Sequence, residues 1–222
     1  MTEVYAIVPV REFRNTKLRL SAVLTESERA SLTGALLKHV ISVLLRSKKI
    51  TAVIVVSTDP REVASALGPL EKIRIIQESK FHGGVNSAVN DGIEQVRFQK
   101  EKDPMILVLP SDLPLLTRDS VDNAIDLLDK YDLVINPSIK KDGTNLLEFR
   151  LSNLIRLYYD QDSYTNHVRE AQSRKLDFLM IEWKEFSFDV DDPEDLNELN
   201  NKFKTESVAS LIKQLEINSI GL

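Results

Sequence analysis

The sequence predicts an α/β domain with a mixed, mostly parallel central sheet flanked by helices. Apolar runs without alternating polar residues occur at 4–8, 52–56 and 105–109, and such runs are typical of strands that helices cover on both faces. Between them lie segments with apolar residues at helical spacing, of which 25–46 is the clearest. The 222 residues contain no linker or repeat and fit a single domain, 1–222, with a helical extension from about residue 206.

Composition narrows the function classes. With 29 Lys and Arg against 34 Asp and Glu, the net charge of −5 argues against a general nucleic-acid-binding surface. The chain has no cysteine, which excludes disulfides and thiolate chemistry. Its apolar runs are too short to span a membrane, and its N-terminus enters a strand without a signal-like segment. We therefore expect a cytoplasmic protein that binds neither nucleic acid nor membrane.

The first half of the chain predicts alternating strands and helices. Strands are expected at 4–10, 52–56 and 73–77. Thr25 and Glu28 form a capping-box pattern that opens the long helix. Asp59 followed by Pro60 is the N-cap and first-turn pattern of a second helix. A third helix is expected from the paired glycines Gly83 and Gly84 to about Val96.

The second half continues the pattern with shorter elements. The expected elements are strands at 105–109 and 133–136, helices at 117–129 and 160–173, a turn at 142–145 that leads into a strand at 146–149, and a short alternating strand at 186–191. Asp192 and Pro193 then predict a capped helix. Apolar residues recur at helical spacing after about residue 206, so this segment is expected to pack on the domain or on a partner subunit.

Asp112 is the first candidate functional residue. It follows the buried run 105–109, and open α/β sheets place their ligands outside the carboxyl ends of the strands. Pro114 prevents the chain from continuing directly into a helix, so the segment should hold a fixed shape. The alternative is that Asp112 is an ordinary turn residue in Ser-Asp-Leu-Pro.

Asp189 and Asp191 form a second candidate group. They alternate with Phe188 and Val190 and are expected to point to one face together. Two carboxylates on one face repel unless a cation lies between them, and a hard divalent cation such as Mg²⁺ prefers oxygen ligands. A zinc site is disfavoured because the chain has no cysteine and three scattered histidines.

Two loops are candidates for binding an anionic ligand. The segment 11–19 carries Arg11, Arg14, Lys17 and Arg19 at the exit of the first strand, where they could cradle a phosphate or simply form a solvated loop. The paired glycines at 83–84 let backbone approach a ligand closely, or form a tight turn. The two common nucleotide fingerprints, G-x-G-x-x-G and the Walker lysine loop, are absent from the sequence.

Seven motifs together resemble the 2-phospho-L-lactate guanylyltransferases, which act in the synthesis of the deazaflavin coenzyme F-420. They are PVREFRNTKLRL, LTESER, GGVNSAVNDG, LPSDLPLL, DGTNLL, DSYTNH and DVDDPEDL, and they cover roughly residues 4–199. Each motif is modest alone, and their order and spacing are jointly specific. The resemblance implies a nucleotidyltransferase domain of the glycosyltransferase-A-like fold. It also implies a reaction of GTP with 2-phospho-L-lactate that yields lactyl-2-diphospho-5'-guanosine and pyrophosphate.

The resemblance also implies roles for individual residues, which we state as expectations. Asp112, Asp189 and Asp191 would hold Mg²⁺, and Arg11, Lys17 and Arg19 would lie over the triphosphate. Gly84, Asn86 and Pro9 would lie beside the nucleotide, while Thr144, Ser163 and Asp160 would contact the small acid. A phosphate dianion is already a nucleophile, so no histidine is needed as a general base. A homodimer is a further expectation.

Two other functions remain open on the sequence alone. A nucleotide-sugar glycosyltransferase of the same fold would use the Asp-x-Asp pair to bind a nucleotide diphosphate and would not release pyrophosphate. A non-catalytic nucleotide-binding module would bind GTP without turnover. The residues do not distinguish 2-phospho-L-lactate from phosphoenolpyruvate or 3-phosphoglycerate, nor guanine from other bases.

Overall fold

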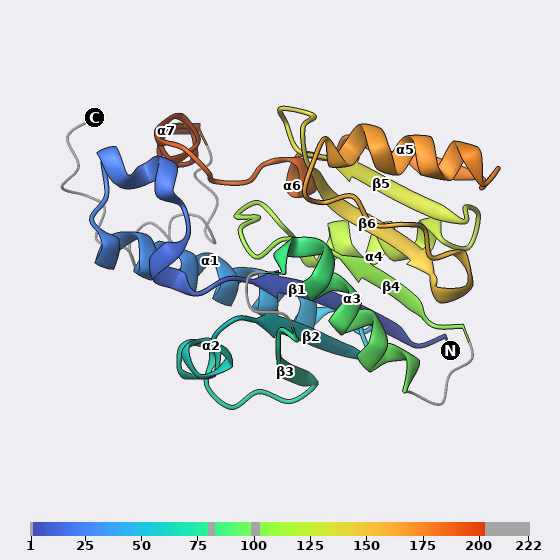
Figure 1. Ribbon diagram of the computed structural model, residues 1–222, viewed down its shortest axis with the longest axis horizontal. Helices are drawn as coiled ribbons and strands as arrows, with labels where there is room; N and C mark the ends of the chain where they lie inside the picture. The colour runs from blue at the N-terminus through green and yellow to red at the C-terminus, as the bar shows by residue number, and fades with distance from the viewer. Residues whose placement is uncertain (1, 80–82, 99–102, 203–222) are drawn as a thin grey trace.

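A seven-stranded sheet forms the centre of the computed structural model, which describes residues 2–79, 83–98 and 103–202 (Figure 1). The strands are β1 (Val4–Val10), β2 (Ala52–Ser57), β3 (Ile73–Gln77), β4 (Met105–Val108), β5 (Leu133–Pro137), β6 (Thr144–Arg150) and β7 (Phe178–Met180). Their order is β3-β2-β1-β4-β6-β5-β7. Strand β6 pairs antiparallel with β4 and β5, and the other pairs are parallel. The predicted mixed, mostly parallel α/β fold is confirmed.

Helices cover both faces of the sheet. They are α1 (Glu26–Arg46), α2 (Pro60–Leu67), α3 (Gly84–Arg97), α4 (Arg118–Leu127), α5 (Ser163–Ser173), α6 (Lys184–Ser187) and α7 (Pro193–Lys202). Short 3-10 turns occupy Phe13–Asn15 (η1), Leu18–Ala22 (η2) and Leu151–Asn153 (η3). The capping box of Thr25 and Glu28 is confirmed, as is the cap that Asp59 provides for α2. No helix in the described ranges is both long and apolar enough to cross a bilayer.

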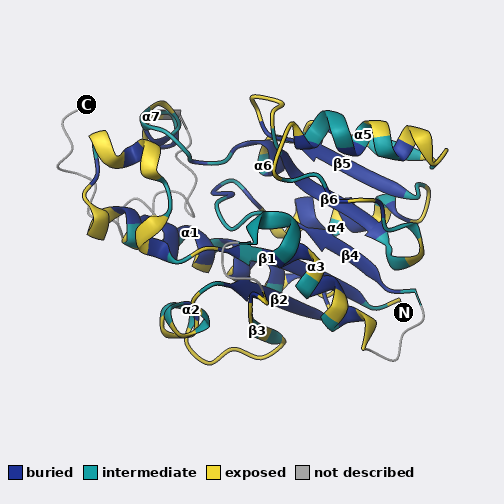
Figure 2. Ribbon diagram, in the orientation of Figure 1, coloured by how far each residue is buried: buried dark blue, intermediate teal, exposed yellow. Residues whose placement is uncertain are grey.

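The strands divide their side chains between two apolar layers, and Figure 2 shows the central strands as buried. One layer contains Val8, Val55 and Leu107 and is covered by α1, α2, α4 and α6. The other contains Ile7 and Phe149 and is covered by α3 and α5. In α3, a Cβ at Gly92 would lie 2.6 Å from Ile7 Cγ2, so glycine lets this helix approach β1 closely. This contact sets the distance of α3 from the sheet, and hence the position of Gly84, the first residue of the helix.

A third apolar cluster lies beyond the edge of the sheet. It joins Leu20 and Leu24, which follow the basic segment 11–19, to Leu32 and Leu36 of α1. The same cluster includes four residues before or within α7, which are Phe188, Val190, Leu196 and Leu199. Figure 1 shows α7 and the segment after β1 at the same end of the molecule. The cluster therefore anchors two segments that carry candidate site residues but belong to no strand.

Several expected boundaries are wrong. Residues 186–191 do not form a strand: α6 ends at Ser187, and 188–191 have no regular structure. Burial of Phe188 and Val190 in the third cluster explains their alternation with the aspartates. Strand β6 begins at Thr144, and α5 begins at Ser163 rather than 160. Strand β7 and helix α6 were not predicted. The expected extension from about residue 206 lies outside the described residues.

One carboxyl group is buried in the sheet without a hydrogen-bond partner among the described residues. Glu148 is 0% exposed, lies opposite Leu107 and Val134, and neither of its carboxyl oxygens is hydrogen bonded. Burial, followed by the charge of Asp126, raises the pKa of Glu148 well above its usual value near 4.5, and Lys49 offsets only part of this effect. Burial therefore favours the neutral form of this carboxyl group.

We predict that Glu148→Met stabilises the protein, and more so at high pH. Above about pH 4.5 the unfolded chain loses the proton of Glu148 while the folded chain keeps it, so the wild-type free energy of unfolding falls as pH rises. The variant removes this loss, and its gain in melting temperature should be larger near pH 8 than near pH 5. An equal change at both pH values would contradict the prediction. Glu148→Gln is the control. It also cannot ionise but adds no apolar contact, so it separates the effect of the charge from the effect of packing.

Candidate active site

A cavity of about 700 Å³ opens at the carboxyl ends of β1 and β4. Strand β6 runs antiparallel to β4, so its first residue lies at the same edge of the sheet as the last residues of β4. Nine of the predicted site residues line this cavity: Pro9, Arg11, Arg19, Gly84, Asp112, Thr144, Ser163, Asp189 and Asp191. They come from widely separated parts of the chain, and the sheet topology brings them together.

Asp112 is held by the apolar residues that follow it. Leu113 and Leu116 are buried in the layer between the sheet and α1, which fixes the segment after β4. The Asp112 side chain is 19% exposed, and its Oδ2 accepts a hydrogen bond from Lys17 Nζ at 2.8 Å. Asp112 is therefore more than a turn residue, because its carboxylate faces a cavity and has a cationic partner.

Lys17 is the buried cation of the site. Its side chain is 5% exposed, and its Nζ also donates to the Val190 carbonyl oxygen at 2.5 Å and lies 3.6 Å from Asp191 Oδ1. Its backbone adopts the left-handed region with φ 51°, which turns the chain between η1 and η2. Burial by itself lowers the pKa of Lys17, but Asp112, Asp191 and Asp189 outweigh it and leave the pKa raised. Lys17 stays charged, bound to carboxylates rather than free in an open cradle.

Asp189 and Asp191 carry negative charge that Lys17 only partly balances. Burial and the charges of Asp112 and Asp191 raise the pKa of Asp189 to about 7. Burial and Asp112 also raise the pKa of Asp191, against the opposing charges of Lys17 and Arg19. An additional positive charge at this corner of the cavity would stabilise the ionised carboxylates.

The donor chemistry of this corner fits Mg²⁺, although the carboxylates do not form a closed ligand set. Nowhere in 2–79, 83–98 or 103–202 do three His, Cys, Asp or Glu side chains form a group that could hold a metal ion. Mg²⁺ usually binds one or two carboxylates together with substrate phosphates and water, so it does not require such a group. The assignment of Asp112, Asp189 and Asp191 to Mg²⁺ stays a prediction.

The four cations of the segment 11–19 separate in the structure. Arg11 and Arg19 are exposed residues at the cavity, while Lys17 is absent from its lining. Arg14 points to another region, where its Nε lies 3.9 Å from Glu26 Oε1. Arg11 and Arg19 are thus the cations of this segment that can reach a ligand in the cavity.

The paired-glycine loop contacts the segment before α5. Gly84 has φ 80°, and a Cβ there would lie 2.8 Å from Asp160 Oδ1. Asn86 Oδ1 accepts from the Tyr159 backbone N–H at 2.8 Å, and its Nδ2 donates to Asp160. Asn86 and Asp160 therefore join the first turn of α3 to the segment before α5 and do not line the cavity, in contrast to Gly84.

Sequence reasoning missed several groups near the cavity. Tyr159 lines it, and the hydroxyl of Tyr159 is buried with no hydrogen-bond partner within 2–79, 83–98 and 103–202. Thr144 Oγ1 accepts from Ser163 Oγ at 3.1 Å and lies 3.0 Å from Nδ1 of His167, which is fully buried. The only signal for His167 was its position one turn into the helix of DSYTNH, which does not show what the ring contacts.

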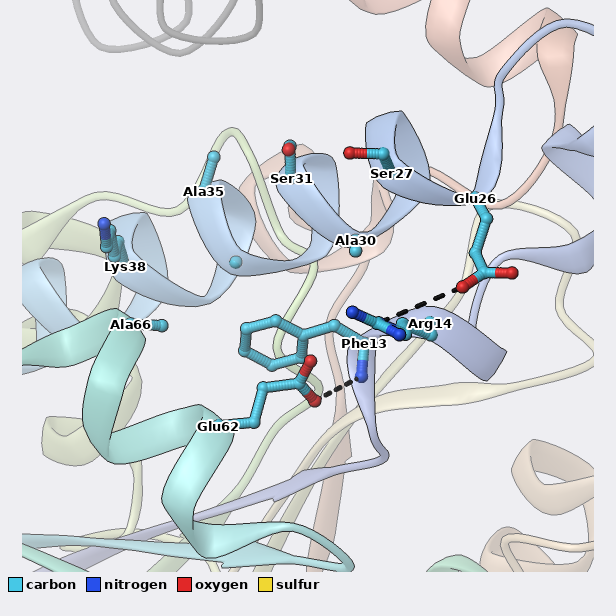
Figure 3. Close-up of a pocket in the computed structure, with 11 residues that line it drawn as sticks. Phe13, Arg14, Glu26, Ser27, Ala30, Ser31, Ala35, Lys38, Glu62 and Ala66 are labelled. Atoms are coloured by element: carbon cyan, nitrogen blue, oxygen red, sulfur yellow. Dashed lines mark hydrogen bonds and ion pairs between the residues drawn. The ribbon is translucent and has the colours of Figure 1, made fainter.

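A second cavity, of about 820 Å³, lies between α1, α2 and η1 (Figure 3). Figure 3 shows the Phe13 ring between the two helices, with the Phe13 N–H bonded to Glu62 Oε2 at 2.8 Å. Small residues of α1, such as Ala30 and Gly34, form much of its wall. None of the predicted metal, nucleotide or acid-binding residues lines it, so the cavity at the end of β4 is the candidate active site.

Comparison with protein families gives a match that spans nearly the whole chain. Residues 4–219 match the model of the CofC-like guanylyl transferases. The chain belongs to this family. As a CofC-like guanylyl transferase it is a nucleotidyltransferase, and the family resemblance predicted from the motifs is confirmed.

Two relatives of this chain are guanylyltransferases named for different acids. The chain is 34% identical to the 2-phospho-L-lactate guanylyltransferase of Methanocaldococcus vulcanius, over 87% of this chain and 82% of that protein. It is 31% identical to the phosphoenolpyruvate guanylyltransferase of Sphaerobacter thermophilus, over 87% of this chain and 91% of that protein. Similarity to both proteins supports the family but does not decide which acid is the substrate of this chain.

Solved structures share the fold. A protein from Desulfovibrio desulfuricans G20, described as a nucleotide-diphospho-sugar transferase, superposes with a TM-score of 0.79 at 20% identity, over 99% of this chain and 97% of that one. The 4-diphosphocytidyl-2C-methyl-D-erythritol synthase of Anaerococcus prevotii gives a TM-score of 0.63 at 13% identity, over 95% and 96% of the two chains. These similarities support the nucleotidyltransferase fold and carry no substrate assignment.

We predict that Lys17→Met destabilises the protein whereas Arg19→Met does not. Removing the buried ammonium leaves Asp112 and Asp191 without their cation, and the loss should lie near the lower end of the roughly 3–5 kcal/mol expected for a broken buried pair, because Asp191 is half exposed. Arg19 is exposed, so its removal should change stability by less than about 0.5 kcal/mol. Urea unfolding of both variants measures the difference. Equal stability of the two would contradict the structural role of Lys17.

Proposed function

We propose that the protein transfers the guanylyl group of GTP to the phosphate of a small phosphorylated acid, with 2-phospho-L-lactate as the first candidate. The observation that carries the proposal is the convergence of acidic, basic and hydroxyl side chains on one cavity of a CofC-like guanylyl transferase. Phosphoenolpyruvate is the second candidate, because a relative of similar identity is a phosphoenolpyruvate guanylyltransferase.

The proposed reaction is an in-line displacement at phosphorus. A phosphate oxygen of the acid bonds to the α-phosphorus of GTP, the bond from that phosphorus to the bridging oxygen breaks, and pyrophosphate leaves. The attacking oxygen is already an anion and needs no general base. The main barrier is bringing two polyanions together, so positioning and charge neutralisation should dominate catalysis.

Different parts of the cavity suit different parts of the substrates. Arg11 and Arg19 are exposed cations that could neutralise the triphosphate. Asp112, Asp189 and Asp191 would hold Mg²⁺, which when bound supplies positive charge to the phosphate oxygens. The hydroxyls of Thr144 and Ser163 would contact the acid, and Gly84 and Pro9 would lie against the nucleotide.

The direct test is incubation of the protein with GTP, Mg²⁺ and 2-phospho-L-lactate, phosphoenolpyruvate or 3-phosphoglycerate in turn. We expect pyrophosphate release with at least one acid, together with a product whose mass equals the acid plus a guanylyl group. Release of a nucleoside diphosphate would instead support a glycosyltransferase. GTP binding without turnover of any acid would overturn the proposed reaction.

We also predict that Asp191→Asn lowers turnover by about 100-fold or more, whereas Asp192→Asn does not. The two residues are adjacent, but Asp191 lines the cavity while Asp192 caps α7 and pairs with Lys140. Steady-state kinetics at saturating GTP and Mg²⁺ measures the effect, with thermal melts to compare stability. Near-normal turnover of Asp191→Asn would remove this residue from the active site.

A further inference from the structure

His167 lies beneath the proposed acid-binding end of the cavity, and both of its ring nitrogens are engaged. The residue is 0% exposed. Its Nε2 lies 2.9 Å from the Tyr158 backbone nitrogen, and its Nδ1 lies 3.0 Å from Thr144 Oγ1. The rings of Tyr158 and Tyr159 meet His167 edge-on, at centroid distances of 6.0 and 5.0 Å. The imidazole is thus fixed in position and orientation.

The contact with Tyr158 determines the tautomer of His167. A backbone N–H can only donate, so Nε2 must be the acceptor and carries no hydrogen. Burial lowers the pKa of His167 to about 4, so the ring is neutral near pH 7. A neutral imidazole has one N–H, which must then be on Nδ1. His167 therefore donates a hydrogen bond to Thr144 Oγ1.

Thr144 receives a second hydrogen bond from Ser163. The Ser163 hydroxyl donates to Thr144 Oγ1 at 3.1 Å, so this oxygen accepts hydrogen bonds from both Ser163 and His167. A hydroxyl oxygen has two lone pairs and one hydrogen. With both lone pairs occupied, the hydroxyl of Thr144 can act toward a further group only by donating. Thr144 lines the cavity, where a ligand oxygen could accept this hydrogen bond.

We infer that His167 is a positioning residue for the acid substrate: through its Nδ1–H it makes the Thr144 hydroxyl a dedicated hydrogen-bond donor to an anionic oxygen of that substrate. The inference rests on the proposed function. Without His167, the Thr144 hydroxyl could rotate and present a lone pair to the substrate, which would repel a carboxylate or phosphate oxygen. His167 is not a proton donor to substrate, because Thr144 and Tyr158 occupy both of its nitrogens.

The role of His167 predicts a selective effect on the acid. In steady-state kinetics with the acid that the wild type uses, His167→Phe should raise the KM of the acid about tenfold or more and change the KM of GTP by less than about twofold. His167→Asn places an amide N–H near the position of Nδ1 and should restore most of the affinity. His167→Gln places its amide near Nε2 and should not. Equal KM values for the Asn and Gln variants would overturn the inference.

A double-mutant cycle tests whether His167 acts through Thr144. Thr144→Val removes the hydroxyl, so adding His167→Phe to it should produce little further rise in the KM of the acid. Multiplicative effects of the two substitutions would overturn the inference. Tyr158→Phe is the matched control, because it removes a hydroxyl that bonds Glu170 at 3.3 Å but keeps the backbone N–H that faces His167. Its kinetics should match the wild type.

The tautomer can be measured without any substrate. Long-range ¹H–¹⁵N NMR of the wild-type protein should show a protonated Nδ1 and an unprotonated Nε2 for His167 near pH 7. A protonated Nε2 would overturn the inference even if the proposed reaction were established. Conversely, failure of every acid to react would overturn the proposed function while leaving the measured tautomer intact, so the two failures are distinguishable.

Discussion

The ammonium group of Lys17 connects three segments that lie between the strands and helices of the fold. It bonds Asp112 after β4 and the Val190 carbonyl before α7, and its own backbone belongs to the loop after β1. Burying a lysine is unfavourable unless its charge is compensated, and compensation here comes from carboxylates that would otherwise repel one another. The opposite charges of the ammonium group and the carboxylates therefore offset one another's cost of burial. The third apolar cluster holds the same segments from outside.

This arrangement divides the cations of the basic segment into two kinds. Lys17 is almost fully buried and belongs to the framework, whereas Arg11 and Arg19 are exposed at the cavity. A guanidinium group carries a permanent positive charge, and its planar N–H groups can bind two phosphate oxygens at once. A loop that appears from its composition to be a uniform basic patch therefore contains one buried cation, two cations exposed at the cavity, and Arg14, which lies beside Glu26 away from it.

The hydroxyl groups of the cavity are organised by hydrogen bonds between neutral side chains. They come from the start of β6 and the start of α5, and a buried imidazole lies behind them. Tyr159 adds a phenol whose pKa is raised by burial, so it too remains neutral. A cavity lined by both charged groups and neutral donors suits the proposed reaction between a triphosphate and a small anion. In that reaction the charged groups would neutralise phosphate charge, and the neutral groups would direct hydrogen bonds.

The sequence by itself determined the order of the main strands and helices, the caps at Thr25 and Asp59, and the family, because these depend on neighbouring residues or on motif order. Only the tertiary structure decided that β6 runs antiparallel to β4, which brings Thr144 beside the carboxyl ends of the parallel strands. The same holds for the separation of Lys17 from the exposed arginines, and for the contacts of His167. These features depend on pairs of residues far apart in the chain, and local periodicity contains no information about which distant partner a side chain meets.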